Sequence, residues 1–447
     1  MVNLIDLVGR LQAVKILVIG DILLDTYTHG QTRRVSPEAP VVIINVKQEE
    51  HRPGGAGNVA LNLISLGAHV TFFGRVGQDW AGEFLERYLI SENIDVSGLV
   101  VQQGYATPIK NRVIADHQQI VRIDREEFSS LSPELEQEII DSLDVALQDV
   151  TMVAISDYGK GFFSPSLLQA VIKKALSFDI PIITDPKGSD FKRYEGTTII
   201  KPNLSEAYAA ANLAPHSSLE LVAAQLFKQT NASLVMITRS ESGISLFHAN
   251  GQREDFQTNV KDVKDVTGAG DTVLAMFAYA LANKLSPQEG VVLCNAAAGI
   301  AIETVGCARV NMIDLAVRLC DSHLLDKIFH VKDLFILQAS LHGKNFNLMI
   351  LKEDCTVNHA LLLALRQASK ENILLIHIES DASGTPLIDM LVSLREVAAI
   401  ALGKEFCNVF ANTLKPQSVY YFDEVSQAAQ TCEAILSSEA ILLSETR

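Results

Sequence analysis

Short apolar runs alternate with longer amphipathic stretches along the N-terminal part of the chain. We predict buried strands at residues 16–19, 70–73, 152–155, 180–184, 198–200 and 234–237. We predict helices at residues 57–66, 81–90, 133–148, 165–177 and 219–229. This alternation is typical of an α/β domain in which helices cover both faces of a parallel sheet.

Two segments depart from this alternation and predict a β lid. Residues 26–48 and 107–124 are rich in Val, Ile and Thr and carry few helix signals. We interpret them as antiparallel strands of a small sheet beside the main one. The alternative is that they are edge strands of the main sheet.

A second α/β series begins near residue 348. We predict its strands at 348–351, 373–378 and 397–402, and its helices at 358–368 and 386–395. The expected organisation is therefore a larger domain over residues 1–315, a linker over 316–340 and a smaller domain over 341–447.

Composition narrows the class of protein. The 447 residues are too many for one core, and 48% of them are hydrophobic, as in chains that bury large cores. The net charge of −16 argues against a nucleic-acid surface and a polybasic membrane anchor. The six scattered cysteines form no C-x-x-C pair, and no apolar run is long enough to span a membrane. We expect a cytoplasmic protein with reduced thiols.

The segment 265–272, Asp-Val-Thr-Gly-Ala-Gly-Asp-Thr, is followed by an apolar helix that we predict over residues 273–281. Its small residues let several backbone N–H groups converge at a helix N-terminus, which suits a phosphoryl group in transfer. Asp271 lies where a carboxylate can accept a proton from a substrate hydroxyl. The alternative is that Asp271 only complements the helix dipole.

Two further motifs point to ligands. Gly54 and Gly55 allow a close backbone approach and Asn58 offers an amide at a helix start, although a tight turn with positive φ also explains the glycines. Asn203 and Glu206 would lie beside a hydrated Mg²⁺ near nucleotide phosphates. A capping box explains the same spacing and, for this motif alone, is the better interpretation.

Taken together, and in their order along the chain, which is Gly54 to Asn58, then Asn203 to Glu206, then residues 265–272, these three motifs resemble the ribokinase-like sugar kinase family. The resemblance covers about residues 10–312. It implies a doubly wound sheet with a β lid, in which ATP phosphorylates a sugar hydroxyl. It also implies ATP and Mg²⁺ as cofactors, K⁺ as a further candidate, and a homodimer.

Further segments resemble the kinase domain of the bacterial heptose kinase/ADP-heptose synthase family. They are residues 20–25, 36–41, 52–56, 110–112, 118–124, 156–161 and 185–188. The resemblance implies ATP-dependent phosphorylation of O1 of D-glycero-β-D-manno-heptose 7-phosphate, in lipopolysaccharide precursor synthesis. The alternatives are a kinase for another sugar or sugar phosphate, and a catalytically silent sugar- or nucleotide-binding scaffold.

The resemblance and the residue chemistry together assign candidate roles. Catalysis is expected from the carboxylate of Asp271 and the backbone amides of Gly268, Ala269 and Gly270. The sugar phosphate is expected to contact Asp21, Asp25, Gly54, Gly55, Asn58, Arg112, Asp157, Lys160 and Lys187. Taken alone, each of these cations is an ordinary solvated surface residue. The nucleotide is expected to contact Asn203, Leu204, Ser205, Glu206, Thr238, Gly243 and Asn295.

The smaller domain resembles the nucleotidyltransferase of the same bifunctional family but departs from its H-x-G-H motif. At the matching place, residues 352–361 read Lys-Glu-Asp-Cys-Thr-Val-Asn-His-Ala-Leu, which keeps one histidine, His359. The acidic pair Glu353-Asp354 would repel a triphosphate. The family's late Ser/Thr-rich motif is also missing from residues 442–447. We predict a domain that has lost nucleotidyl transfer and is kept for packing or dimerisation.

Overall fold

A computed structural model describes residues 4–116, 118–258, 263–304, 306, 309–322, 327–330, 333–380, 385–403, 414–423 and 428–431. The chain divides into two compact units, Leu11–Met312 and Met1–Arg10 together with Ile313–Arg447. No helix in these ranges is long and apolar enough to cross a membrane.

A nine-stranded sheet runs through the larger unit in the order β13-β12-β11-β10-β9-β8-β1-β4-β5. The strands are β1 (Lys15–Gly20), β4 (His69–Gly77), β5 (Asp95–Gln102), β8 (Met152–Ser156), β9 (Ile182–Asp185), β10 (Ile199–Ile200), β11 (Leu234–Thr238), β12 (Ile244–His248) and β13 (Arg253–Phe256). From β5 to β11 all neighbours pair in parallel, whereas β12 and β13 pair antiparallel. The sheet is therefore mixed at one edge, which corrects the prediction of a parallel sheet.

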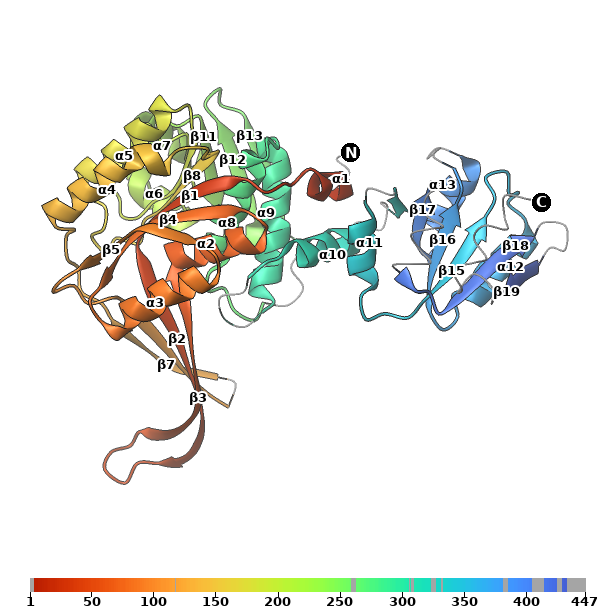
Figure 1. Ribbon diagram of the computed structural model, residues 1–447, viewed down its shortest axis with the longest axis horizontal. Coiled ribbons are helices and arrows are strands. Elements are labelled where there is room, and N and C mark those ends of the chain that lie inside the picture. Colours follow the sequence, from red (N-terminus) through yellow and green to blue (C-terminus); the bar gives the residue numbers. More distant parts are fainter. Residues whose placement is uncertain are drawn as a thin grey trace. The chain divides into compact units, whose positions relative to one another are not determined.

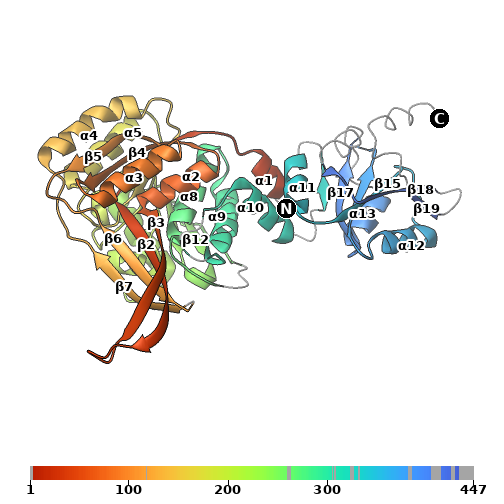
Figure 2. The same cartoon turned by 60° about the horizontal axis from the view of Figure 1, so that its bottom comes forward.

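Helices cover both faces of this sheet, as the sequence predicts (Figure 1). They are α2 (Ala56–Ser65), α3 (Trp80–Ser91), α4 (Pro133–Ala146), α5 (Pro165–Ser177), α6 (Leu204–Ala211), α7 (Leu219–Thr230), α8 (Ala269–Ala282) and α9 (Pro287–Ile302). Apolar residues of α4, α5, α6 and α7 form one core with β1, β8 and β11. Helices α2, α3, α8 and α9 lie on the other face (Figures 1 and 2). The α/β prediction is confirmed.

The lid is a separate four-stranded sheet in the order β3-β2-β6-β7, which extends away from the main sheet (Figure 2). Its strands are β2 (Ile22–Val35), β3 (Val42–Gly55), β6 (Ile109–Ala115) and β7 (Gln118–Arg125). This confirms the lid and excludes the edge-strand alternative. Strands β2 and β6 pair in parallel, however, so the prediction of antiparallel strands throughout is wrong.

The smaller unit contains a six-stranded sheet in the order β14-β17-β16-β15-β18-β19. Its strands are β14 (Ile328–Phe329), β15 (Phe346–Leu351), β16 (Ile373–Ile378), β17 (Val397–Leu402), β18 (Ser418–Asp423) and β19 (Ala428–Thr431). Its helices include α1 (Leu4–Gly9), α12 (His359–Ala368) and α13 (Pro386–Ser393). Helices α10 (Met312–Ser322) and α11 (Leu334–Leu341) occupy much of the expected linker. Residues 442–447 lie outside the described residues.

Candidate active site

Asp271 lies in the first turn of α8, and only 3% of it is exposed. Its Oδ2 accepts a hydrogen bond from Asn58 Nδ2 at 2.9 Å, and its Oδ1 accepts one from the Tyr158 hydroxyl at 2.6 Å. Burial raises the pKa of Asp271 to about 7, although both hydrogen bonds act to lower it. A carboxylate with this pKa can act as a general base near neutral pH.

The loop before Asp271 has the geometry of an anion site. Gly268 is the N-cap of α8 and adopts a left-handed conformation with φ of 77°, which a glycine reaches without strain. The backbone therefore turns sharply into the helix at Ala269 and Gly270, where the first N–H groups of the helix have no intrahelical partner. The structure thus places these amides next to Asp271.

Asn58 is held in place by a network of amides. Asn62 Nδ2 donates to the backbone and side-chain oxygens of Asn58 at 2.9 and 3.2 Å, and Asn62 Oδ1 accepts from Val310 N at 3.2 Å. Asn58 and Asn62 are both buried. Because its own orientation is fixed, the Asn58 amide fixes Asp271 in turn.

Asp21 follows β1 and holds a loop. Its carboxylate accepts hydrogen bonds from the backbone N–H groups of Tyr158, Lys160 and Phe162 at 2.9, 3.2 and 3.4 Å. Burial, together with the nearby charge of Asp157, raises the pKa of Asp21 to about 6. The sequence assigns Asp21 to the sugar, whereas in the structure its oxygens already accept loop amides.

Asp157, the second predicted acceptor, is similarly engaged. It accepts hydrogen bonds from Gly159 N and the Tyr194 hydroxyl, both at 2.7 Å, and Arg193 lies at 3.6 Å. The exposed fraction of its side chain is 2%. Asp157 therefore stabilises the same loop through the N–H group of Gly159.

Asp25 and Arg112 form a buried ion pair across the neighbouring lid strands β2 and β6. Gly54 permits this pair, because a Cβ there would lie 2.1 Å from Asp25 Oδ2. Gly55 has φ of +61°, and its missing Cβ would approach the backbone oxygen of Asp21 to 2.6 Å. Both glycines are thus explained by close backbone approach, and Gly55 also by the positive φ.

Lys160 and Lys110 form a cationic cluster next to this pair. Lys160 forms an ion pair with Glu126 at 2.7 Å, and Lys110 Nζ lies 5.7 Å from the centre of the Tyr158 ring. Burial and the charge of Lys160 lower the pKa of Lys110. Lys110 forms no ion pair with any described residue, so the cluster has charge left over for an anionic ligand.

A cavity of about 590 Å³ brings together several predicted nucleotide residues. Asn203, Thr238, Gly243 and Asn295 line it, as do Ala269 and Gly270 of the α8 N-terminus. The other lining residues include the aliphatic Ile244, Val263, Val266, Val273 and Ile302. A cavity that is apolar at one part and ends at backbone amides suits a nucleotide base and its phosphates.

Asn203 and Glu206 form the capping box that their spacing predicts. Asn203 Oδ1 accepts from Glu206 N at 2.9 Å, and Glu206 Oε2 accepts from Asn203 N at 3.1 Å. Glu206 Oε1 accepts from Lys187 Nζ at 2.8 Å. Lys187 therefore points to the nucleotide motif, whereas Lys160, the cation with which we expected it to act, pairs with Glu126. Leu204, Ser205 and Glu206 do not line the cavity.

Lys201 is buried below the α8 N-terminus and pairs with Asp185 Oδ2 at 2.8 Å. Its Nζ lies 4.0 Å from where a Cβ on Gly270 would be. A buried cation at this place adds to the positive potential of the helix N-terminus.

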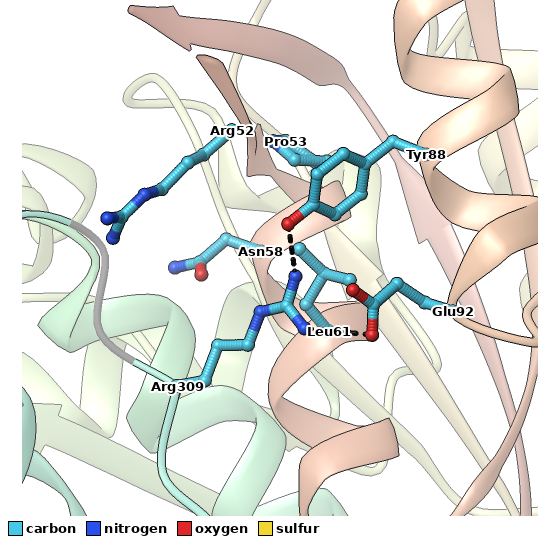
Figure 3. Close-up of a pocket in the computed structure, with 7 residues that line it drawn as sticks. All are labelled: Arg52, Pro53, Asn58, Leu61, Tyr88, Glu92 and Arg309. Carbon is cyan, nitrogen blue, oxygen red and sulfur yellow. Dashed lines mark hydrogen bonds and ion pairs between the residues drawn. The ribbon is translucent and has the colours of Figure 1, made fainter. Parts of the chain in front are cut away.

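A second cavity, of about 290 Å³, adjoins Asn58 (Figure 3). Arg52 and Arg309 approach it from β3 and from the segment after α9, and Arg309 binds the Tyr88 hydroxyl at 2.6 Å and Glu92 at 2.8 Å. Arg52 pairs with Glu50 at 2.9 Å. Each arginine therefore already has an acidic partner.

In the smaller unit, the described residues near the expected nucleotidyltransferase motif have structural roles. Asn358 caps α12 by accepting from Leu361 N at 2.9 Å, and His359 is the first residue of that helix. His377 is buried in β16, with its Nε2 3.0 Å from the Gly403 oxygen. Among the residues that the structure describes, no three His, Cys, Asp or Glu side chains are placed to hold a metal ion.

Comparison with known proteins agrees with this geometry. Residues 14–313 match the pfkB family carbohydrate kinase. The chain belongs to this family. It is 42% identical over 323 residues to the bifunctional protein HldE of Geobacter sulfurreducens, which covers 72% of this chain and 66% of that relative. It is 38% identical over 385 residues to the bifunctional protein HldE of Trichlorobacter lovleyi, at 85% and 78% coverage. The chain thus spans slightly less than two thirds of the first relative's length.

Solved structures confirm the ribokinase-like fold of this pfkB kinase. Ribokinase of Arabidopsis thaliana, complexed with ribose and ATP, aligns with a TM-score of 0.56 at 20% identity and covers 69% of this chain and 99% of its own. Phosphofructokinase-2 of Escherichia coli, in complex with potassium, aligns with a TM-score of 0.57 at 18% identity, with 69% and 98% coverage.

Sequence reasoning missed three residues of the site in this kinase. Tyr158, Lys110 and Lys201 each lie in a segment that carries the family resemblance, but none has a spacing that predicts its partner. The available signals were their positions in the sequence. Tyr158 directly follows Asp157, Lys110 begins the Lys110-x-Arg112 segment, and Lys201 directly precedes Pro202-Asn203.

Proposed function

We propose that this chain is the ATP-dependent kinase that phosphorylates O1 of D-glycero-β-D-manno-heptose 7-phosphate to give the 1,7-bisphosphate. The observation that carries the proposal is the buried Asp271 at the N-terminus of α8, next to the nucleotide cavity and within reach of the lid. Family membership supports the class of reaction. The segments at residues 36–41 and 156–161 support the substrate, because they resemble those of heptose kinases.

In this mechanism, Asp271 accepts the proton of the sugar hydroxyl while the oxygen of that hydroxyl attacks the γ-phosphorus of ATP. The O–H bond breaks, a P–O bond forms, and ADP leaves with the electrons of the β–γ bond. Because charge develops on the transferring group, the amides at Gly268–Gly270 and the Lys201 ammonium would stabilise the transition state. Asn58 and Tyr158 hold the base in orientation.

The phosphate already on the substrate would bind at the lid. Lys110 Nζ lies 5.7 Å from the centre of the Tyr158 ring, whose hydroxyl donates to Asp271, and the charge of Lys160 acts on Lys110. Arg112 is bound to Asp25 and would contribute through its charge. This replaces Lys187, whose ammonium binds Glu206.

The residues of the nucleotide motif fit Mg²⁺ through water rather than directly. The oxygens of Asn203 and Glu206 already accept hydrogen bonds within the capping box and from Lys187. Direct ligation would break these contacts, whereas a bridging water keeps them. K⁺ stays a prediction from the family resemblance, and the cytoplasmic location stays a prediction from the composition and the cysteine pattern.

We assign residues 1–315 to this kinase domain, 316–340 to a linker and 341–447 to a domain without nucleotidyl transfer. The proposal for the last domain rests on the sequence of residues 352–361, where the H-x-G-H motif is missing.

A homodimer through the lid is part of the proposal. The lid sheet exposes the aliphatic residues Val35, Val41, Val42, Val46, Ile120, Val121 and Ile123. Such a cluster on a projecting sheet favours pairing with the same surface of a second copy. Light scattering should give a dimer for the wild type and a monomer for a Val46→Lys/Ile123→Lys variant. Val145→Lys, at a more exposed site on α4, should stay dimeric, and a monomeric wild type would refute this part.

ADP release by the purified chain tests the proposed activity. Heptose 7-phosphate, fructose 6-phosphate, ribose and fructose would be compared with ATP, Mg²⁺ and K⁺ present. We expect turnover with heptose 7-phosphate alone. Turnover with another sugar would overturn the substrate and keep the mechanism, and no turnover with folded protein would favour a silent binding protein.

A further inference from the structure

We propose that Tyr158 is a positioning residue that orients the base of this kinase and is itself set in place by Asp21. The inference rests on the proposed function, because it concerns the carboxylate that would take the sugar proton. The Tyr158 hydroxyl donates to Asp271 Oδ1 at 2.6 Å, while Asn58 Nδ2 donates to Asp271 Oδ2 at 2.9 Å. Two donors from different elements therefore fix the plane of one carboxylate.

The backbone of Tyr158 is fixed by a charge. Asp21 accepts from the N–H groups of Tyr158, Lys160 and Phe162, so one carboxylate holds three amides of the same short loop. Hydrogen bonds to an ionised acceptor are stronger than neutral ones. Asp157 stabilises the loop further through Gly159 N. The loop is thus built to present its side chains in one arrangement.

The Tyr158 ring is also confined on its faces. A Cβ on Gly55 would lie 3.4 Å from the ring, and Lys110 Nζ lies 5.7 Å from its centre. Gly55 therefore packs beside the ring, and the cation attracts its π face. Together with the loop contacts, this directs the hydroxyl at Asp271.

Tyr158 acts as a donor throughout the working pH range. Burial and the neighbouring charge of Asp271 raise the pKa of Tyr158 far above its ordinary value, so the phenol keeps its proton. Its hydrogen bond leaves each Asp271 oxygen with a second lone pair, from which a sugar hydroxyl proton can be accepted. Tyr158 thus supports the ionised form of the base without exchanging its own proton.

Other charged groups around Asp271 set the background. Asp185 from β9 raises the pKa of Asp271, and Lys201, after β10, lowers it. From α9, Cys294 faces Lys201, and burial keeps its thiol protonated. From the lid, Asp25 and Lys110 face the Tyr158 ring. None of these groups donates a hydrogen bond to Asp271 among the described contacts, so Tyr158 and Asn58 are the groups that orient it.

The test compares Tyr158→Phe with Tyr279→Phe in the full chain. Tyr279 lies on α8, the helix that carries Asp271, and its hydroxyl donates to the Gln12 backbone oxygen at 2.9 Å. The control therefore loses a comparable hydrogen bond. Losing the donor to Asp271 should move the acidic limb of the pH profile of kcat/KM upward by about 1–2 pH units. At pH 6 the rate of the variant should therefore be roughly 10–100-fold lower than that of the wild type, whereas at pH 9 most of the rate should be recovered. Tyr279→Phe should match the wild type.

A second replacement covers the case in which Tyr158→Phe does not fold. Replacing Tyr158 by 3-fluorotyrosine keeps the ring and makes the phenol a stronger donor, so the acidic limb should move downward. Unchanged profiles for both replacements would overturn the proposal, and so would a uniform loss of rate at every pH.

The outcome stays separate from that of the proposed function. The profiles are measured with whichever sugar the wild type phosphorylates, so a different substrate leaves this test intact. If the wild type is silent, ¹³C NMR of the Asp271 carboxyl in wild type and Tyr158→Phe gives the same comparison without turnover. Equal titration midpoints would then overturn the positioning role.

Discussion

The two units of this chain share mostly parallel α/β sheets but differ at the carboxyl ends of their strands. In the larger unit, β1, β8 and β9 lead to Asp21, Asp157 and Asp185. In the smaller unit, β15 and β16 lead to Glu353, Asp354 and Glu379, whose side chains are exposed rather than buried. Ligands gather at this edge in such sheets.

Packing of an α/β sheet does not by itself require the buried carboxylates that the larger unit contains. Burying a carboxylate costs free energy unless hydrogen bonds compensate it, and Asp21 and Asp271 have pKa values raised to about 6 and about 7 by burial. Carboxylates with strongly shifted pKa values cluster at functional sites. The smaller unit keeps the fold, while its described residues at the matching edge hold no comparable carboxylate.

The largest effect should come from removing the base. Asp271→Asn should lower kcat by about 10²–10⁴-fold, because a general base contributes that much, while ATP binding and the melting temperature change little. Steady-state kinetics and calorimetric ATP titration would measure this. Asp149→Asn, at an exposed position with left-handed backbone, is the matched control. A variant that keeps most of its kcat would remove Asp271 from the role.

The cations should separate the two ends of the site. Lys110→Gln and Lys160→Gln should raise the KM of the sugar phosphate by about 10–100-fold, since each loses one charge-assisted contact. Lys187→Gln should instead raise the KM of ATP, because its ammonium binds Glu206 of the nucleotide motif. If Lys187→Gln changes only the sugar KM, the phosphate binds where the sequence alone placed it.

The pH dependence should be steep on the acidic side. The pKa of Asp271 lies at about 7, so below that pH the base is protonated and kcat/KM falls about tenfold per unit. Above it the base is ionised and the rate levels off. A pH series from 5 to 9 measures this, and a rate that is flat down to pH 5 would contradict the assignment.

The smallest effect should come from the smaller unit. His359→Ala should leave sugar phosphorylation unchanged, because His359 begins a helix in the unit that does not contain Asp271. Adenylyl transfer should be undetectable in both proteins. Transfer that the wild type shows and the variant lacks would restore a catalytic role to this histidine.

Local patterns predicted most of the fold. Strands such as β16 and β17 lie at the predicted residues because a compact apolar run is a local signal. Strand β13 was missed because its residues, Arg-Glu-Asp-Phe, are mostly polar. The parallel pairing of β2 with β6 depends on contacts distant in sequence, which no local pattern specifies.

The site was predictable in its motifs but not in its partnerships. Asp271, Asn58 and Asn203 follow from glycine-rich turns and helix starts. The Tyr158–Asp271 hydrogen bond joins residues 113 positions apart, and its existence depends on how Asp21 orders the loop. Likewise, only the folded chain shows that Lys187 reaches Glu206 rather than the lid.

One ³¹P NMR experiment tests the contrast between the units most directly. The full chain would be incubated with ATP and Mg²⁺ and, in parallel, with heptose 7-phosphate or heptose 1-phosphate. We predict ADP and a 1,7-bisphosphate from the first mixture, with heptose 7-phosphate, and unchanged ATP in the second, with heptose 1-phosphate. Pyrophosphate in the second mixture, or no bisphosphate in the first, would contradict it.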